Sequence, residues 1–246
     1  MTNTLRIAAI ADLHVKKTSA GAYHELFEQA TRNADILLIC GDLTDYGYVE
    51  EAQILAREIS SSLRIPALAV LGNHDVEAGN EEEIVKILTD VGVTMLDGGT
   101  YEYRGVGFAG VKGFCGGFGR RALGAWGEKA IKDFVHESVN EALKLENALV
   151  RLRTPQKIVL LHYAPIQATV NGEPPEIIAF LGSSRLEEPI DRYRVTAVFH
   201  GHAHRGSPEG RTKGAAPVYN VAMPIVAQMS PPLRIVEVPI DASVAA

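Results

Sequence analysis

Short apolar runs alternate with amphipathic stretches along the first hundred residues. The runs RIAAIA, DILLIC and ALAVL are apolar on both faces, which is typical of buried strands. Between them, residues 20–33 and 49–63 carry helical patterns. This alternation predicts parallel strands in an α/β sheet. A further helix is predicted to begin at Asn80 as N-cap, with Glu83 three residues on, and to end at Gly92.

The second half of the chain continues the mixed pattern. Residues 100–111 read as two paired strands around Gly105, and the glycine-rich stretch 112–128 is too long for a simple connector. A helix is predicted near 128–151, with one apolar face made of Ile131, Val135, Val139, Ala142, Leu145 and Leu149. Strands resume at KIVLL, TAVF, PVYNVAM and LRIVEV. With no internal repeat and no Pro-, Gly- or Ser-rich linker, we expect one domain over residues 1–246.

Composition and charge narrow the class of protein. Hydrophobic residues make up 46% and charged residues 22%, an ordinary balance for a globular chain. The formal charge of −6 argues against a duplex nucleic-acid binder, but a phosphorylated ligand stays open because bound metal ions can invert the local field. Cys40 and Cys115 form neither a disulfide framework nor a zinc-finger spacing, so we expect a reduced, cytoplasmic setting. We expect neither a membrane span nor a signal peptide, since the apolar runs are too short.

Polar clusters follow five of the predicted strands at their carboxyl ends. They are Asp12 with His14, Asp42, Asn73 with His74, His162, and the HGHAH segment at 200–204. This edge is where α/β sheets place their ligand sites. A single Asp or His after a strand is most often a turn residue, but five in one chain are poorly explained that way. Carboxylate and imidazole suit Mn, Fe, Zn or Co, and the lack of thiolates argues against a structural zinc site.

The number of candidate ligands indicates two ions rather than one. The seven candidates are Asp12, His14, Asp42, Asn73, His162, His202 and His204. They exceed what one tetrahedral ion needs, whereas two ions sharing one carboxylate would use them all. On extended backbone, His202 and His204 would share a face but stand several ångströms apart. Each could then serve one of two ions about 3.5–4 Å apart, the separation typical of binuclear hydrolases.

Taken together, the blocks D-x-H, G-D-x-x-D, G-N-H-D, a later single His and G-H-x-H resemble the calcineurin-like metallophosphoesterases. All five occur in the family order between Asp12 and His204. The resemblance implies a four-layer α/β/β/α sandwich that hydrolyses phosphoesters by in-line attack of a hydroxide bridging two metal ions. It implies a first metal held by Asp12, His14 and His204, and a second held by Asn73, His162 and His202, with Asp42 bridging.

The resemblance also implies roles for residues that do not bind metal. His74 would donate a proton or hydrogen bond to the leaving group, which suits a side chain whose pKa lies near working pH. The related Ser/Thr phosphatases indicate Asp45 as its orienting partner, although a turn-stabilising role for Asp45 stays open. Asp75 is an alternative partner, but its position favours hydrogen bonding within the loop. For His200 we expect a structural or supporting role, because seven ligands are already assigned.

The substrate is less defined than the reaction. Where the Ser/Thr phosphatases continue into an arginine, GDLTD continues into Tyr46 and Gly47, which argues against protein dephosphorylation. GDLTD with GNHD looks closer to the bacterial branch that includes cyclic-nucleotide phosphodiesterases. We therefore expect a small phosphodiester or a nucleotide as substrate. A phosphomonoesterase, a dinucleotide polyphosphate hydrolase and an inactive metal-binding module remain as alternatives.

Substrate contacts are expected from the loop at 112–128 and from the residues after the bridging aspartate. Arg120 and Arg121 could hold a phosphate or carboxylate, and Tyr46 could line the pocket. The competing interpretation is that the arginines only keep the loop soluble. The strands of the C-terminal tail could form an edge for a homodimer. Which of Mn, Fe, Zn or Co is bound stays open.

Overall fold

The computed structural model describes residues 3–240, and its first sheet has five strands. Four of them are parallel, namely β1 (Asn3–Ile10), β2 (Ile36–Cys40), β3 (Ala67–Val70) and β4 (Val93–Met95). The fifth, β11 (Arg234–Ile240), pairs antiparallel with β1, so the order is β11-β1-β2-β3-β4. The predicted β-α-β-α-β unit thus forms the parallel part of this sheet.

The second sheet has six strands in the order β5-β6-β7-β8-β10-β9. Its parallel centre consists of β6 (Val106–Gly110), β7 (Gln156–Leu160), β8 (Ala197–His200) and β10 (Pro217–Asn220). The edge strands β5 (Gly99–Tyr103) and β9 (Glu209–Arg211) pair antiparallel with their neighbours. The hairpin predicted around Gly105 is therefore confirmed as β5 and β6.

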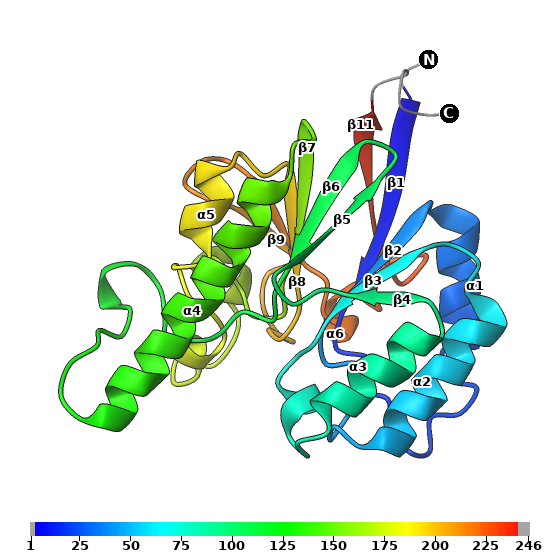
Figure 1. Ribbon diagram of the computed structural model, residues 1–246, viewed down its shortest axis with the longest axis horizontal. Helices are drawn as coiled ribbons and strands as arrows, with labels where there is room; N and C mark the ends of the chain where they lie inside the picture. Colours follow the sequence, from blue (N-terminus) through cyan, green and yellow to red (C-terminus); the bar gives the residue numbers. More distant parts are fainter. Residues whose placement is uncertain (1–2, 241–246) are drawn as a thin grey trace.

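Helices cover the outer face of each sheet. In Figure 1, one side carries α1 (His24–Asn33), α2 (Val49–Ser62) and α3 (Glu81–Asp90), and the other carries α4 (Lys129–Arg151) and α5 (Glu187–Arg192). The short α6 (Met223–Val226) follows β10. The result is a mixed α/β structure with two parallel-rich sheets, as the predicted α/β/β/α class requires. Among residues 3–240, no helix is long and apolar enough to cross a membrane.

The central strands β6 and β8 of the second sheet are apolar on both faces because both of their faces are buried. Phe108 and Phe199 point into the core between the two sheets, which they share with residues of β1 to β3. The neighbouring Val159 and Val198 instead join the core that includes Leu145 of α4. Successive side chains of a strand point to opposite faces, so a central strand with two cores needs a continuous apolar run.

Two predicted boundaries and the side-chain partner of one predicted cap residue differ from the structure for local reasons. α1 begins at His24 rather than at residue 20, because Gly21 has φ +83° and interrupts a helical path. The PVYNVAM strand ends at Asn220, whose side chain donates to the carbonyl of Ala203 at 2.7 Å and accepts from the following turn. Asn80 precedes α3 as predicted, but its side chain donates to the carbonyl of Gly47 instead of capping the helix.

Candidate active site

The five polar clusters lie beyond the carboxyl ends of β1, β2, β3, β7 and β8, and they converge where the two sheets meet. Potential ligand atoms come within 4.8 Å of one another in three groups: Asp12, His14 and His204; Asp42, His162 and His202; and His14, Asp45 and His74. The first group has the members of the first implied ligand set, and the second joins His162 and His202 of the second set to Asp42, the implied bridging residue. Parallel strands end at the same edge of a sheet, so residues up to 192 positions apart become neighbours.

Three lone-pair atoms meet around His162. Its Nδ1 lies 3.1 Å from the carbonyl oxygen of Cys40, so that nitrogen carries the proton and donates it. Its Nε2 faces Asn73 Oδ1 at 2.9 Å and an oxygen of Asp42 at 3.4 Å. With the proton of a neutral ring on Nδ1, these three atoms are all acceptors directed at one point, where a cation would satisfy them together. This donor set of imidazole, amide oxygen and carboxylate fits a divalent transition metal.

The group of Asp12, His14 and His204 contains an imidazole without hydrogen-bond partners. Within residues 3–240, neither buried ring nitrogen of His14 has a hydrogen-bond partner. Burial holds the pKa of His14 below its usual value, so its ring is neutral and its lone pair is available. His204 Nε2 lies 3.1 Å from Asp12 Oδ1, and this hydrogen bond raises the pKa of His204. A buried imidazole without partners is costly in an apolar interior, and a metal ion would satisfy it.

Asp42 lies between the two groups. One carboxylate oxygen faces His162 at 3.4 Å and the other faces His14 at 3.7 Å. The first oxygen also accepts from the backbone N–H of His74 at 2.9 Å, which fixes the orientation of the carboxylate. This side chain can therefore offer one oxygen to each group.

The backbone is strained around the site, and glycines make room for the ligands. Asp12, His14, Asp42 and His202 all have φ between +45° and +69°, a region that costs of order 1–3 kcal/mol for residues other than glycine. A Cβ atom on Gly41, Gly72 or Gly201 would overlap His162, Asp42 or Asp12, respectively. The glycines directly before Asp42, Asn73 and His202 are thus needed for the close approach of a candidate ligand.

His74 is held in place by a backbone carbonyl. Its Nδ1 donates to the carbonyl oxygen of Asp45 at 2.6 Å, so this contact uses the backbone and not the carboxylate that the sequence led us to expect. The Asp45 carboxylate instead lies 3.5 Å from His14 Nδ1. Burial acts to lower the pKa of His74, but the bond to Asp45 and the charges of Asp42 and Glu77 outweigh it and raise the pKa. His74 is therefore suited to carry a proton.

Asp75 supports the loop rather than the imidazole of His74. Its fully buried carboxylate accepts from the backbone N–H groups of Gly72, Leu43 and Thr44, and from the Thr44 hydroxyl. These bonds join the loop after β2 to the loop after β3. Asp75 thus has the role in loop hydrogen bonding that its position in the sequence favours.

The HGHAH segment is a turn and not the extended backbone that we expected. His202 has φ +69° and its backbone N–H donates to the Asp12 carboxylate, while His202 and His204 join different groups. Burial and the neighbouring His162 lower the pKa of His202 to about 3. His200 is buried, and its ring contacts the carbonyl of Gly201 and the hydroxyl of Thr169, both at 2.8 Å. That satisfied ring agrees with a structural role.

The predicted substrate contacts lie outside the three ligand groups. Arg120 and Arg121 form an exposed turn and line a pocket of about 520 Å³ together with Phe118 and Ile178. Tyr46 is 51% exposed and follows Asp45, the residue that holds His74. Their roles stay predictions.

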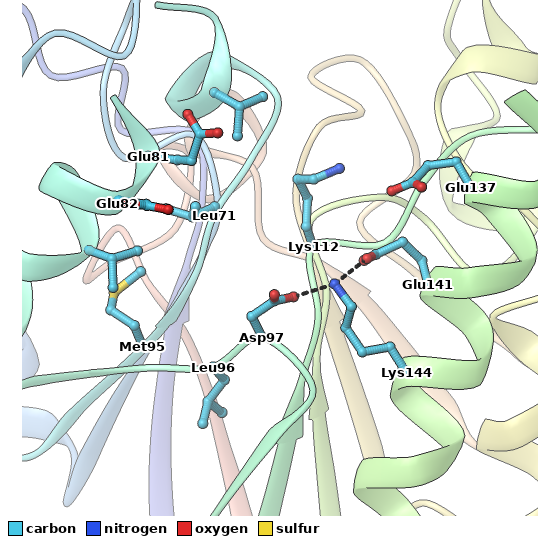
Figure 2. A pocket seen from close by; sticks show the side chains of 12 residues that line it. Leu71, Glu81, Glu82, Met95, Leu96, Asp97, Lys112, Glu137, Glu141 and Lys144 are labelled. Carbon is cyan, nitrogen blue, oxygen red and sulfur yellow. Dashed lines mark hydrogen bonds and ion pairs between the residues drawn. The ribbon is translucent and has the colours of Figure 1, made fainter. Parts of the chain in front are cut away.

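A second cavity, which the sequence did not suggest, borders the segment between β3 and α3, where Leu71 and Val76 line it. This cleft of about 400 Å³ separates α3 from α4, and Lys112 lies between them (Figure 2). The carbonyl of Lys112 accepts from the backbone N–H groups of His162 and Tyr163 at 3.0 and 3.1 Å. Lys112 comes shortly after β6, so the rule of polar residues after strand ends could have found it.

Comparison with known proteins places this geometry in a family. A family model described as calcineurin-like phosphoesterase matches residues 5–206, the stretch that contains every candidate ligand. The chain belongs to this family. It is accordingly a hydrolase of phosphoric esters, and the family uses divalent metal ions. Among curated protein sequences, none matches the chain.

Solved structures of this family share the fold at low sequence identity. The phosphopantetheinyl hydrolase of Mycobacterium tuberculosis superposes with a TM-score of 0.66 at 16% identity, over 94% of this chain and 95% of that one. The TT1561 protein of Thermus thermophilus gives 0.56 at 15% identity, covering 97% and 100%. A putative 5′-nucleotidase from Staphylococcus aureus, solved with alpha-ketoglutarate, gives 0.54 at 14% identity over 89% of this chain and 48% of that one.

Proposed function

We propose that this chain is a dinuclear metal-dependent phosphodiesterase that acts on a small phosphodiester or nucleotide. The observation that carries the proposal is the convergence of potential ligand atoms around Asp42, which faces the unpartnered ring of His14 on one side and His162 on the other. Asp12, His14 and His204 would hold one ion, and Asn73, His162 and His202 the other. When bound, two such cations lower the pKa of a water between them and neutralise charge on the phosphoryl oxygens.

The chain's own residues would supply positioning and the proton. Hydroxide adds to phosphorus, and the bond between phosphorus and the alcohol oxygen opposite to it breaks. His74 would give the proton from Nε2 to the departing alcohol oxygen and regain one from water. The bond from Nδ1 to the Asp45 carbonyl fixes the ring and leaves Nε2 on the side of Asp42, 4.0 Å from its carboxylate. The raised pKa of His74 favours the protonated form that this step requires.

A direct test replaces the residue between the two groups. Asp42→Asn keeps the size of the side chain but removes the charge that would hold both ions. With Mn²⁺ and bis(p-nitrophenyl) phosphate, we expect kcat/KM to fall by at least about 10²-fold. Asp90→Asn, an exposed residue at the end of α3, is the matched control and should keep wild-type activity. Undiminished hydrolysis by Asp42→Asn would contradict the two-metal proposal.

A phosphomonoesterase is the second candidate, favoured by the putative 5′-nucleotidase among the structural neighbours. The same ligand groups would serve, and only the surroundings of the phosphate would differ. Comparing bis(p-nitrophenyl) phosphate with p-nitrophenyl phosphate separates the two. We expect the diester to be the better substrate, and a clear preference for the monoester would support the second candidate.

A further inference from the structure

One peptide group connects His74 to a buried carboxylate on α2. The carbonyl oxygen of Asp45 accepts from His74 Nδ1 at 2.6 Å, and the N–H of the same peptide group belongs to Tyr46. That N–H donates to Oε2 of Glu51 at 2.9 Å. The N–H and C=O of a trans peptide point in opposite directions, so His74 and Glu51 lie on opposite sides of one planar group. A row of two hydrogen bonds therefore runs from the imidazole to the carboxylate.

Capping of α2 accounts for only part of the contacts of Glu51. Its side chain is buried, with 2% of the residue exposed, and its Oε2 also accepts from the backbone N–H of Tyr48 at 3.3 Å. Tyr48 directly precedes α2, where a carboxylate interacts favourably with the helix dipole. The shorter bond, however, is the one to Tyr46, two residues before the helix cap. Glu51 thus holds the loop after β2 as well as the start of the helix.

The same loop lies against the segment that carries His74. Gly47 has φ +70°, and a Cβ atom there would come within 2.8 Å of the Asp75 carbonyl oxygen and 3.0 Å of the His74 carbonyl oxygen. The Gly47 carbonyl accepts from the side chain of Asn80 at 3.0 Å. The position of the Asp45 carbonyl relative to His74 therefore depends on how this loop is held, and Glu51 is one of the side chains that hold it.

A carboxylate at one end of such a row strengthens the hydrogen bond at the other end. Its negative charge polarises the peptide group, so the Asp45 oxygen becomes a better acceptor for the proton on His74 Nδ1. No proton passes through the peptide. The effect on the imidazole is to fix the ring and to keep a proton on Nδ1, which leaves Nε2 on the side of Asp42, 4.0 Å from its carboxylate.

We propose that Glu51 is a positioning residue for His74 and acts through the peptide group between Asp45 and Tyr46. Resting on the proposed function, this gives Glu51 the orienting part that the sequence led us to expect of the Asp45 carboxylate, which faces His14 instead. The orienting carboxylate is thus placed on α2 and reaches the imidazole through the backbone.

The first test needs neither metal nor substrate. The proton on His74 Nδ1 has an NMR resonance that can be observed with isotope-labelled histidine and assigned by its absence in His74→Ala. Glu51→Gln keeps an acceptor oxygen but removes the charge, so we expect the resonance to move upfield as the hydrogen bond weakens. Glu50→Gln is the matched control. Glu50 lies in the same first turn with an exposed side chain paired to Lys17, and its replacement should leave the resonance unchanged.

The second test varies how much the leaving group needs a proton. 4-Nitrophenyl methyl phosphate releases a stable phenolate, whereas phenyl methyl phosphate releases a more basic one that gains more from a general acid. With Mn²⁺, Glu51→Gln should lower kcat about fivefold for the phenyl ester and less than about twofold for the nitrophenyl ester. Combined with His74→Ala, the same change should have no further effect, because the residue through which Glu51 acts is missing.

Because Glu51 also contacts the start of α2, Tm is measured for each variant. A change that only weakened this cap would lower Tm and affect both esters alike. Glu51→Asp keeps the charge on a shorter side chain and serves as a second variant if Glu51→Gln does not fold. Its loss of kcat should again be selective for the phenyl ester. Metal content should equal that of the wild type, since Glu51 belongs to none of the three ligand groups.

The outcomes separate this proposal from the proposed function. A moved resonance, together with a loss of kcat that is selective for the phenyl ester and depends on His74, supports the role of Glu51. An unmoved resonance, equal or absent losses for the two esters, or a loss that persists without His74 overturns that role and leaves the phosphodiesterase proposal standing. Failure of the wild type to hydrolyse either ester with Mn²⁺ contradicts the phosphodiesterase proposal, and with it the part of Glu51 in catalysis.

Discussion

Two adjacent residues after β3, Asn73 and His74, are expected to have different roles. Asn73 points its amide oxygen at His162, inside a group of candidate ligands, whereas His74 is tied to the carbonyl of Asp45. We predict that His74→Ala binds both metal ions but lowers kcat by about 10²–10⁴-fold, the usual contribution of a general acid. Asn73→Ala should lower the metal content instead, because it removes a ligand. Metal analysis of the purified variants together with kcat at saturating Mn²⁺ checks both.

Comparing these two variants separates loss of catalysis from loss of metal. If activity fell only because metal was lost, kcat of Asn73→Ala would recover with added Mn²⁺, while kcat of His74→Ala would not. A His74→Ala protein that lacked metal, and whose residual activity followed metal occupancy, would show that the two roles have been divided wrongly.

At the scale of elements, Asp35 connects β1 to the start of β2. Its carboxylate accepts from the backbone N–H of Arg6 at 2.8 Å and from the Arg6 guanidinium at 3.2 Å, with Arg104 at 3.5 Å. Burial acts to raise the pKa of Asp35, but the hydrogen bonds from Arg6 outweigh it and bring the pKa below its usual value. The ionised form is therefore stabilised in the folded protein.

The sign of the pH dependence follows from that shift. A carboxyl group with a lowered pKa contributes stability above its unfolded pKa of about 4, and the contribution is lost as the pH falls through the folded value. We predict that Asp35→Asn lowers the free energy of unfolding by about 1 kcal/mol at pH 7, since Arg6 is partly exposed. Urea unfolding at several pH values should show this difference shrinking below about pH 4. A difference that is independent of pH would exclude the ionic contribution.

Elements and ligands were predicted from the sequence with different success. Burial on both faces gives β2 and the last three residues of β7 continuous apolar runs. The polar residues after these runs mark the edge of the site, so both features were visible from the sequence. The start of α1 was not visible from the sequence, because it depends on the left-handed conformation of Gly21. The backbone contact from Asp45 to His74 was also not visible, since the sequence gives residue types but not which atom of Asp45 faces the imidazole. Likewise, the cleft at Lys112 arises only when α3 and α4 are brought together.

For the whole molecule, the site connects the two sheets. Candidate ligands after β1, β2 and β3 belong to the first sheet, and those after β7 and β8 belong to the second. The three close groups each contain side chains held by buried loops, with strained backbone at Asp12, His14 and Asp42. Without cations, repulsion between ligand atoms and that strain both act against the assembled site. Bound cations would remove the repulsion and hold the two sheets together at this edge.

Metal binding should therefore stabilise the whole fold and not only the loops. A ligand that binds only the folded state at 100 times its Kd adds about 2.7 kcal/mol, and for a chain of this size about 1 kcal/mol corresponds to 2–4 °C in Tm. We predict that Mn²⁺ raises the Tm of the chelator-treated wild type by roughly 5–10 °C. Asp42→Asn should lose most of this increase and the control Asp90→Asn none of it. Calorimetry measures the shift without any substrate. Equal shifts in both variants would mean that the metal binds elsewhere, since Asp42 faces His14 of one ligand set and His162 of the other.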